Sequence, residues 1–273
     1  MKTSARVVRV TLIVLSVVSV ATGSGATDFV STAGAAGPPF ITTIGTIGAT
    51  ASAHAKRVAP PTTAGHFGTL PPGSVLPSDE ACAALVRPAV EIRAANTTAN
   101  NNRGSRANAN TRSDWSGFNR VDGDFAGTTD QLIQWAACKW GIDEDIVRAQ
   151  MIKESGWYQS AIGDNGESFG IGQVRTTAHP SAFQYTINAR TSTAYNLDYT
   201  YASWRACYEG VYTWLNTVEH NGTYAAGDEW GCVGLWFSGR WYVNTDSYLN
   251  QTGDSVHWHY TNKTWLTSAF INS

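Results

Sequence analysis

The pattern of hydrophobic and polar positions divides the chain into three parts. An apolar run occupies residues 10–21, whereas residues 27–77 show neither helical nor strand periodicity. From residue 78 onward, apolar residues recur at the three- and four-residue spacing of amphipathic helices. The pattern therefore predicts one mainly helical domain over 78–273, preceded by a segment without regular structure.

The helices of this domain are predicted from periodicity and from their stop signals. They are expected at 81–95, 128–139, 143–155, around 190–218 and around 228–238. An Asn-, Arg- and Thr-rich stretch at 96–112 is expected to be a loop.

One predicted helix ends on a carboxyl group that continues an apolar face. Val147, Met151 and Glu154 are spaced i, i+4 and i+7, and Gly156 is expected to stop the helix. A carboxyl in this position is either buried and paired or placed for chemistry. Burial would raise its pKa and keep it protonated, as a general acid must be. Glu154 is therefore the candidate catalytic residue.

The loop after this helix, GDNGESFGIGQV at 163–174, is rich in glycine. Glycines let a backbone approach a ligand closely, and Ser168 and Gln173 stand between them as polar side chains. No phosphate-loop lysine follows, so the glycine spacing alone says little about a ligand.

The motifs Glu154-Ser155-Gly156 and Ser168-Phe169-Gly170-Ile171-Gly172-Gln173 together resemble the signature of soluble lytic transglycosylases and goose-type lysozymes. The upstream Trp140-Gly141-Ile142-Asp143 is similar to the segment that leads into that family's catalytic helix. The specific match covers 138–174 and the wider one 135–240. The resemblance implies a mainly α, lysozyme-like α+β single domain with a very small β element in the glycine loop.

The resemblance also implies an activity, lytic transglycosylation of the MurNAc-GlcNAc bond in the glycan strand of peptidoglycan. Glu154 would protonate the leaving oxygen, and Ser155, Ser168 and Gln173 would support it. The carboxylate would then activate the sugar's own 6-hydroxyl, which gives an anhydromuramic end.

Two alternatives to this activity remain open. If Asp164 or Glu167 positions a water, the protein would be a hydrolysing muramidase, since ordinary glycosidases use two carboxyl groups. A non-catalytic wall-binding protein on the same scaffold is the other alternative.

Aromatic side chains are numerous, with 11 tryptophans in the chain, and such rings stack on sugars. The candidate substrate-binding residues are Trp157, Phe169, Tyr195, Asn196, Trp236 and Trp241. The family often places a Tyr-Asn-Ala-Gly turn opposite its glutamate, and here Trp236-Phe237-Ser238-Gly239 lacks the phenol. Its role would fall to Tyr195, to Tyr242 or to no residue.

The first 26 residues are predicted to be a secretory signal peptide. Lys2, Arg6 and Arg9 precede an apolar run that is too short for a comfortable membrane span. Removing them changes the formal net charge from −2 to −5, so bulk charge would not hold the protein on an anionic wall. An uncleaved anchor is the alternative.

The chain's export signal predicts a secreted or cell-wall-associated bacterial protein, periplasmic in a Gram-negative cell. We expect a monomer without a stable membrane anchor, a nucleic-acid partner or a cofactor. Residues 27–77 are expected to be a flexible Ala/Gly/Thr/Pro linker, in which His54 and His66 are not ligands.

Four cysteines in an exported chain predict two disulfides, for which three pairings exist. We predict Cys82–Cys138 and Cys207–Cys232. No C-x-x-C spacing is present, and His257 and His259 are expected at the surface, so no metal site is predicted.

Overall fold

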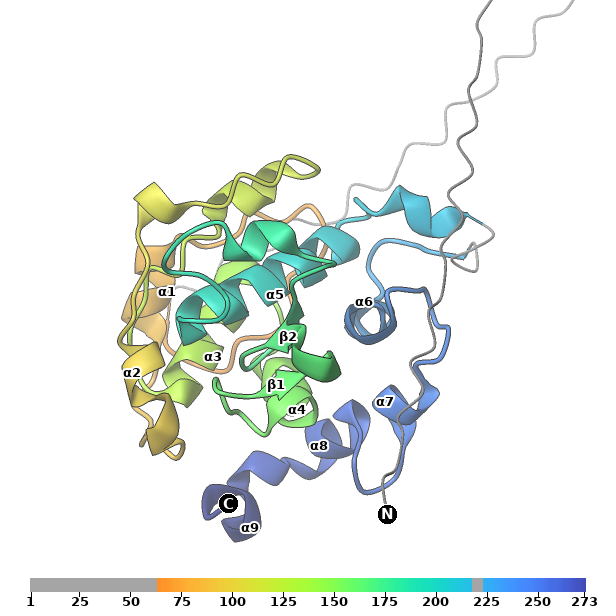
Figure 1. The fold of residues 1–273 in the computed structure, drawn as a ribbon. Coiled ribbons are helices and arrows are strands. Elements are labelled where there is room, and N and C mark those ends of the chain that lie inside the picture. Colours follow the sequence, from red (N-terminus) through yellow and green to blue (C-terminus); the bar gives the residue numbers. More distant parts are fainter. Residues whose placement is uncertain (1–62, 218–222) are drawn as a thin grey trace, which may run out of the picture. The chain divides into compact units, whose positions relative to one another are not determined.

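The computed structural model describes residues 63–217 and 223–273, which form a mainly helical domain with a small sheet (Figure 1). The expected fold class is thereby confirmed. The α-helices are α1 (Asp79–Leu85), α2 (Thr97–Asn100), α3 (Thr129–Trp140), α4 (Glu144–Ser155), α5 (Thr193–Tyr208), α6 (Glu229–Ser238), α7 (Asp246–Asn250), α8 (Val256–Asn262) and α9 (Ser268–Ile271). The predicted signal peptide and residues 27–62 of the linker lie outside the described residues.

Helices α3 and α4 begin and end where local side chains favour it. Thr128 and Gln131 form a capping box at the start of α3, and Gly141 ends that helix in the left-handed region at φ 57°. The Asp143 side chain caps α4, and Gly156 ends it at φ 60°. The predicted bounds of both helices are therefore confirmed to within a residue or two.

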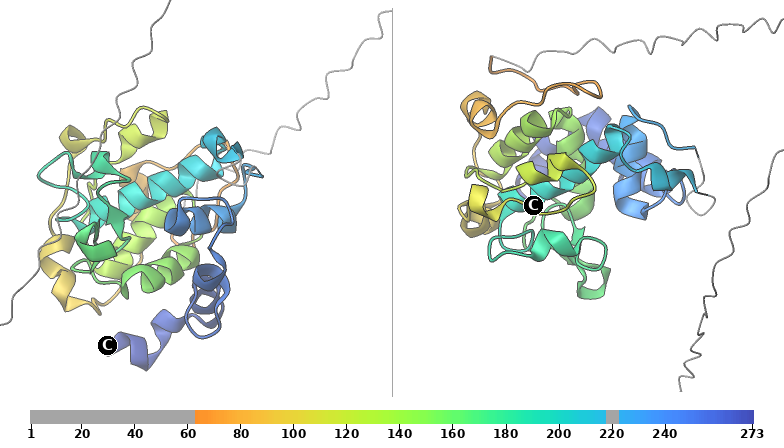
Figure 2. Two further views of the ribbon diagram at one scale, coloured as in Figure 1. Left: turned by 45° about the vertical axis from the view of Figure 1, so that its right-hand side comes forward. Right: turned by 90° about the horizontal axis from the view of Figure 1, so that it is seen from above.

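Helix α5 is the centre of the domain, since every residue along it is buried. It packs against α3 on one side and α6 on another, and the views of Figures 1 and 2 show it crossing the middle of the domain. The large rings of Trp135, Trp140 and Tyr201 are fully buried in this core. A helix without an exposed face is typical of the interior of a domain.

A three-stranded antiparallel sheet lies between α4 and α5 in the chain. Its strands are β1 (Ile162–Gly163), β2 (Ser168–Phe169) and β3 (Val174–Arg175), in the order β1-β2-β3. Phe169 is opposite Ile162 on one side and Val174 on the other. The sheet occupies the predicted glycine loop.

The C-terminal helices return to α4. Helix α6 packs on α5, α7 on α6, and α8 on both α7 and α4, as Figure 1 shows. Segments that are far apart in sequence, α4 and α6 to α8, are thereby neighbours. Within residues 63–217 and 223–273, none of the helices has the length and hydropathy needed to cross a membrane.

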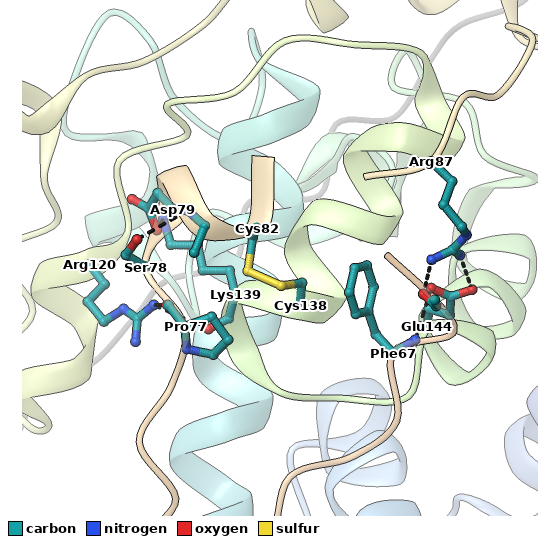
Figure 3. The surroundings of a disulfide bond; sticks show 12 residues. Phe67, Pro77, Ser78, Asp79, Cys82, Arg87, Arg120, Cys138, Lys139 and Glu144 are labelled. Atoms are coloured by element: carbon teal, nitrogen blue, oxygen red, sulfur yellow. Dashed lines mark hydrogen bonds and ion pairs between the residues drawn. A yellow bond between two sulfur atoms is a disulfide. The ribbon is translucent and has the colours of Figure 1, made fainter. Parts of the chain in front are cut away.

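Both predicted disulfides are confirmed. Cys82–Cys138 joins α1 to α3 with 5.6 Å between the Cα atoms, and its surroundings are shown in Figure 3. Cys207–Cys232 joins α5 to α6 with a Cα separation of 5.8 Å. The second bond holds α6 against the central helix.

The last part of the expected linker is packed against the domain. Phe67 and Leu70 are buried, and the Leu70 N–H donates to the Gly141 carbonyl at 3.1 Å. The Arg205 guanidinium donates to the carbonyls of Leu70 and Pro71. The domain therefore includes residues before Ser78, because two large apolar side chains there gain burial.

The N-terminal helical prediction over 81–95 is too long. Helix α1 ends at Leu85, and Val86 is extended. Pro88 explains the stop, because proline lacks an N–H and disfavours helical backbone in the residue before it. Conversely, the predicted loop 96–112 contains the short helix α2 and a 3-10 turn at Arg106–Asn108.

Candidate active site

The Glu154 side chain lines a cavity of about 570 Å³. The wall is made by the end of α4, the three-stranded sheet at 162–175 (called the β-hairpin below), α6 and Tyr248 of α7, together with Arg112 from the loop before α3. The C-terminal helices therefore close the site that α4 begins.

The face of α4 that carries Glu154 is anchored in the core. Met151 and Val147, about one and two turns earlier, are fully buried, as their spacing predicts. The Ser155 hydroxyl donates to the Ile171 carbonyl at 2.8 Å and so ties the helix end to the glycine loop. Ser155 thus contacts backbone, whereas the prediction placed it beside the carboxyl.

The Glu154 carboxyl accepts a hydrogen bond at Oε1 from the Tyr248 hydroxyl. Burial raises the pKa of Glu154 to about 7; the Tyr248 hydrogen bond and the Lys153 charge act in the opposite direction, and the Asp164 charge adds to the rise. The Tyr248 ring stacks on Phe237, with 4.4 Å between ring centroids. The tyrosine that contacts the carboxyl is therefore itself packed against a second ring from the C-terminal helices.

Tyr248 fills the position that the sequence left open between Tyr195 and Tyr242. Tyr195 is buried in α5, where its hydroxyl accepts from Asn110 at 3.2 Å. Tyr242 donates to Asp228 at 2.9 Å. Both tyrosines are therefore committed elsewhere, and the phenol beside Glu154 comes from α7.

The β-hairpin contributes a second carboxyl group to the cavity. Asp164 lines it and accepts from the Ser168 hydroxyl at 2.6 Å. Glu167 does not line the cavity and pairs with Arg175 at 2.7 Å. Asp164 is itself exposed, so it lines the cavity while remaining in contact with solvent.

Gln173 and Asn196 shape the hairpin. The Gln173 side chain lines the cavity, but its amide donates to the carbonyls of Ala161 (3.2 Å) and Gly170 (2.8 Å). Asn196 is fully buried in α5 and accepts from the Gly172 N–H at 2.8 Å. Asn196 is therefore a support for the loop and has no exposed atom for a substrate.

The aromatic wall of the cavity includes Trp236, one of the candidate residues, with Trp204 and Trp214. The Trp236 ring stacks on His179, with 4.9 Å between centroids and 14° between planes, and its Nε1–H donates to the Gly172 carbonyl. Burial lowers the pKa of His179 to about 4, with a contribution from the Arg112 charge. His179 is therefore neutral at physiological pH.

Three other aromatic candidates do not line this cavity. Trp157 is buried, donates to the Arg148 carbonyl and lines a separate groove. Phe169 packs against Phe183 and the Arg190 guanidinium. Trp241 is 2% exposed and contacts Tyr224. Burial in the core, for which aromatic rings are equally suited, explains all three positions.

His66, which was not expected to be a ligand, lies beside acidic side chains. One ligand atom each of His66, Glu144 and Asp145 lies within 4.8 Å of the others, which is the spacing of a possible metal site. However, Glu144 pairs with Arg148 at 2.7 Å and Asp145 with Lys263 at 2.7 Å, so both carboxylates already have cationic partners. Figure 3 shows Glu144 beside Phe67 and Arg87.

The two C-terminal histidines differ from each other. His259 was expected at the surface but is buried, and its Nδ1 is 2.7 Å from the Thr264 hydroxyl. His257 packs against Trp230, with 3.8 Å between ring centroids.

Helix-borne glutamate, β-hairpin and aromatic wall together define a lysozyme-like domain, and a comparison with protein families supports this class. Residues 130–263, just under half of the chain, match the family model Glucosaminidase, described as mannosyl-glycoprotein endo-beta-N-acetylglucosaminidase. Searches of curated proteins and of solved structures found no match. The matched residues include Glu154 and Tyr248 but exclude Arg112, which also lines the cavity.

Sequence reasoning missed Tyr248, His179 and Arg112. Tyr248 is 94 residues from Glu154, and no motif marks it. A buried acid needs a hydrogen-bond partner, which indicates that such a residue exists but not where it lies.

Proposed function

We propose that the protein is an exported enzyme that cleaves the glycan strand of peptidoglycan, with Glu154 as the general acid. The observation that carries the proposal is the Glu154 carboxyl group. It lines a large cavity, and burial raises its pKa to about 7. A group with that pKa is protonated over the range in which a glycosidic oxygen must receive a proton.

Lytic transglycosylation is the outcome we propose for the second half of the reaction. Glu154 would protonate the leaving oxygen, and the substrate's N-acetyl group would stabilise the developing positive charge. The Glu154 carboxylate, held by the Tyr248 hydroxyl, would then remove the proton from the sugar's 6-hydroxyl as that oxygen attacks. The similarity of the two motifs to lytic transglycosylases supports this outcome.

Hydrolysis is the second candidate, and the position of Asp164 favours it. Asp164 lines the same cavity as Glu154, and the Ser168 hydroxyl orients its carboxyl. A second carboxylate facing the scissile bond allows a water to be activated in place of the 6-hydroxyl. The matched family is named for a glucosaminidase, which is consistent with this alternative.

A non-catalytic wall-binding protein would use the cavity only to bind the glycan. Trp236, Trp204 and Trp214 would stack on sugar rings, and the acidity of Glu154 would be irrelevant. Such a protein gains nothing from a shielded carboxyl with a raised pKa, because desolvating that group costs free energy.

Mass analysis of fragments from purified peptidoglycan tests the proposal. We expect anhydromuramic ends, which are lighter than reducing ends by one water. Reducing ends alone would establish hydrolysis, and Asp164→Asn should then abolish their release. Binding to peptidoglycan without any released fragment would contradict both enzymatic outcomes.

A further inference from the structure

His179 is held in a fixed position in the wall of the cavity. Its ring stacks on Trp236 and contacts the Tyr199 ring edge-on, with 5.5 Å between the latter two centroids. Its backbone N–H donates to the Arg175 carbonyl at 2.9 Å, and its carbonyl accepts from the Ala182 N–H at 3.0 Å. Packing and backbone hydrogen bonds therefore fix this side chain before a ligand binds.

The two ring nitrogens of His179 have different surroundings. Nδ1 lies 3.5 Å from the Tyr199 hydroxyl, which is itself 3.0 Å from the Ser181 hydroxyl. Nε2 has no hydrogen-bond partner within residues 63–217 and 223–273, and solvent reaches it, since it is not one of the buried polar atoms that lack a partner. An unpaired, accessible nitrogen on a ring that lines the cavity is available to a ligand.

The charges around His179 favour a neutral group as its ligand. Burial, together with the Arg112 charge, lowers the pKa of His179 to about 4, so the imidazole is uncharged at physiological pH. Each cation that lines the cavity has a carboxylate partner, and the pairs are Arg112–Asp114 (2.6 Å), Lys153–Asp254 (2.7 Å) and Arg175–Glu167 (2.7 Å). In the described part of the chain, an anionic ligand would therefore find no unpaired cation in this wall.

We propose that His179 is a substrate-binding residue, which hydrogen-bonds an uncharged polar group of the glycan, a hydroxyl or an acetamide, through Nε2. The identity of this ligand rests on the proposed function. A neutral imidazole presents either a donor or an acceptor at Nε2, depending on its tautomer, and both of these glycan groups can donate and accept. Because the ring is already fixed, the bond costs little side-chain freedom.

A structural role for His179 is the alternative. In that case the residue would matter through Nδ1 and the Tyr199 hydroxyl, or through its ring on Trp236, and Nε2 would make no contact. Substitutions separate these possibilities, because an asparagine amide nitrogen takes the place of Nδ1 and a glutamine amide nitrogen that of Nε2. Phenylalanine keeps a ring for Trp236 but offers no nitrogen.

The test is calorimetric binding of a soluble oligomer of N-acetylglucosamine, with every variant combined with Glu154→Gln so that the ligand is not cleaved. We expect His179→Asn and His179→Phe to raise Kd by about three- to tenfold, the range for the loss of one neutral hydrogen bond. His179→Gln should stay within about twofold of the parent, because it retains a polar group at the position of Nε2.

His257→Phe is the matched control. His257 also packs its ring against a tryptophan, Trp230, but it does not line the cavity. Its substitution should leave Kd unchanged. In NMR of protein labelled with ¹⁵N-histidine, the oligomer should shift the Nε2 signal of His179, assigned from His179→Gln, and leave the signals of His257 in place. A residue with only a structural role would show no such shift.

Unchanged affinity in both His179→Asn and His179→Phe would overturn the proposal, and so would loss of affinity in His179→Gln with retention in His179→Asn. If all three variants are weak binders, or if one is unfolded in thermal unfolding, the Nε2 signal of the parent decides, and an unshifted signal at saturation overturns the proposal. Failure of the oligomer to bind at all would overturn it as well.

The proposed function is tested separately, by release of fragments from peptidoglycan. A protein that binds the oligomer through Nε2 but releases no fragments would overturn the proposed enzymatic function and leave the binding role of His179 standing. Fragment release with an unshifted Nε2 signal would do the opposite.

Discussion

At the scale of single residues, the raised pKa of Glu154 results from opposing effects, of which burial is the largest. Desolvation raises its pKa, whereas the Tyr248 hydrogen bond and the Lys153 charge lower it. The direction was predicted from the apolar face of α4. The aromatic ring that contacts the carboxyl comes from a distant helix, since Tyr248 of α7 hydrogen-bonds Glu154, while Trp157 in the turn after α4 lies outside the cavity.

A pH–rate profile should reflect this pKa. The acid is needed in its protonated form, which predominates below the folded-state pKa of about 7, so activity on soluble glycan should fall as pH rises through about 7. An unshifted glutamate would lose its proton near 4.3 instead. The measurement is kcat/KM between pH 4 and 9 on a neutral oligosaccharide, with roughly half-unit steps.

The neutral substrate separates titration of the enzyme from titration of the ligand. His179 does not account for the fall, because its lowered pKa keeps it neutral throughout the upper part of the range. A profile that is flat from pH 5 to pH 9 would contradict the assignment of Glu154 as the acid, since a loss of about one decade is expected by pH 8.

At the scale of elements, the glycine-rich hairpin is held by its close approach to α5. A Cβ added at Gly170 would lie 2.2 Å from Asn196 Nδ2, and one added at Gly172 would lie 2.5 Å from Thr200 Oγ1. The sequence suggested close approach to a ligand. The structure shows that these glycines make room for another helix, which positions Asp164 and Ser168 in turn.

Gly170→Ala should therefore destabilise the protein by about 3 kcal/mol, from the clash with α5 and from the left-handed backbone at φ 80°. Gly166→Ala is the matched control. Its φ is also positive, at 96°, but no atom lies within 4 Å of an added Cβ, so a loss of about 1 kcal/mol is expected. Urea unfolding measures both.

Equal losses for the two alanine variants would show that backbone strain alone is responsible. In that case the packing of the hairpin on α5 would not be what holds Asp164 in the cavity.

At the scale of the whole molecule, the sequence predicted what is local and missed what is distant. Glu154, the bounds of α3 and α4, and a small sheet in the glycine loop follow from caps, spacing and motifs within about thirty residues. Tyr248 and Arg112 reach the cavity from far along the chain, and only the packing of α6 to α8 and of the N-terminal loop brings them there.

Tryptophan positions show the same limit. Trp236, Trp157 and Trp241 are similar in sequence context, yet only Trp236 lines the cavity beside Glu154. Large aromatic rings suit both a core and a sugar site, so residue type does not separate the two environments. Whether a tryptophan lies in the core or in the cavity wall is decided by tertiary packing, which no local pattern in a single sequence indicates.

The central claim, that Glu154 is the acid of a glycan-cleaving enzyme, is tested most directly by Glu154→Gln beside Glu167→Gln. Both substitutions remove a carboxylate without changing shape, but Glu167 does not line the cavity and is paired with Arg175. With thermal unfolding confirming that each variant is folded, release of fragments from peptidoglycan is measured. We predict that Glu154→Gln lowers turnover by about two to four orders of magnitude and that Glu167→Gln stays near wild type. A folded Glu154→Gln protein with wild-type turnover would contradict the account.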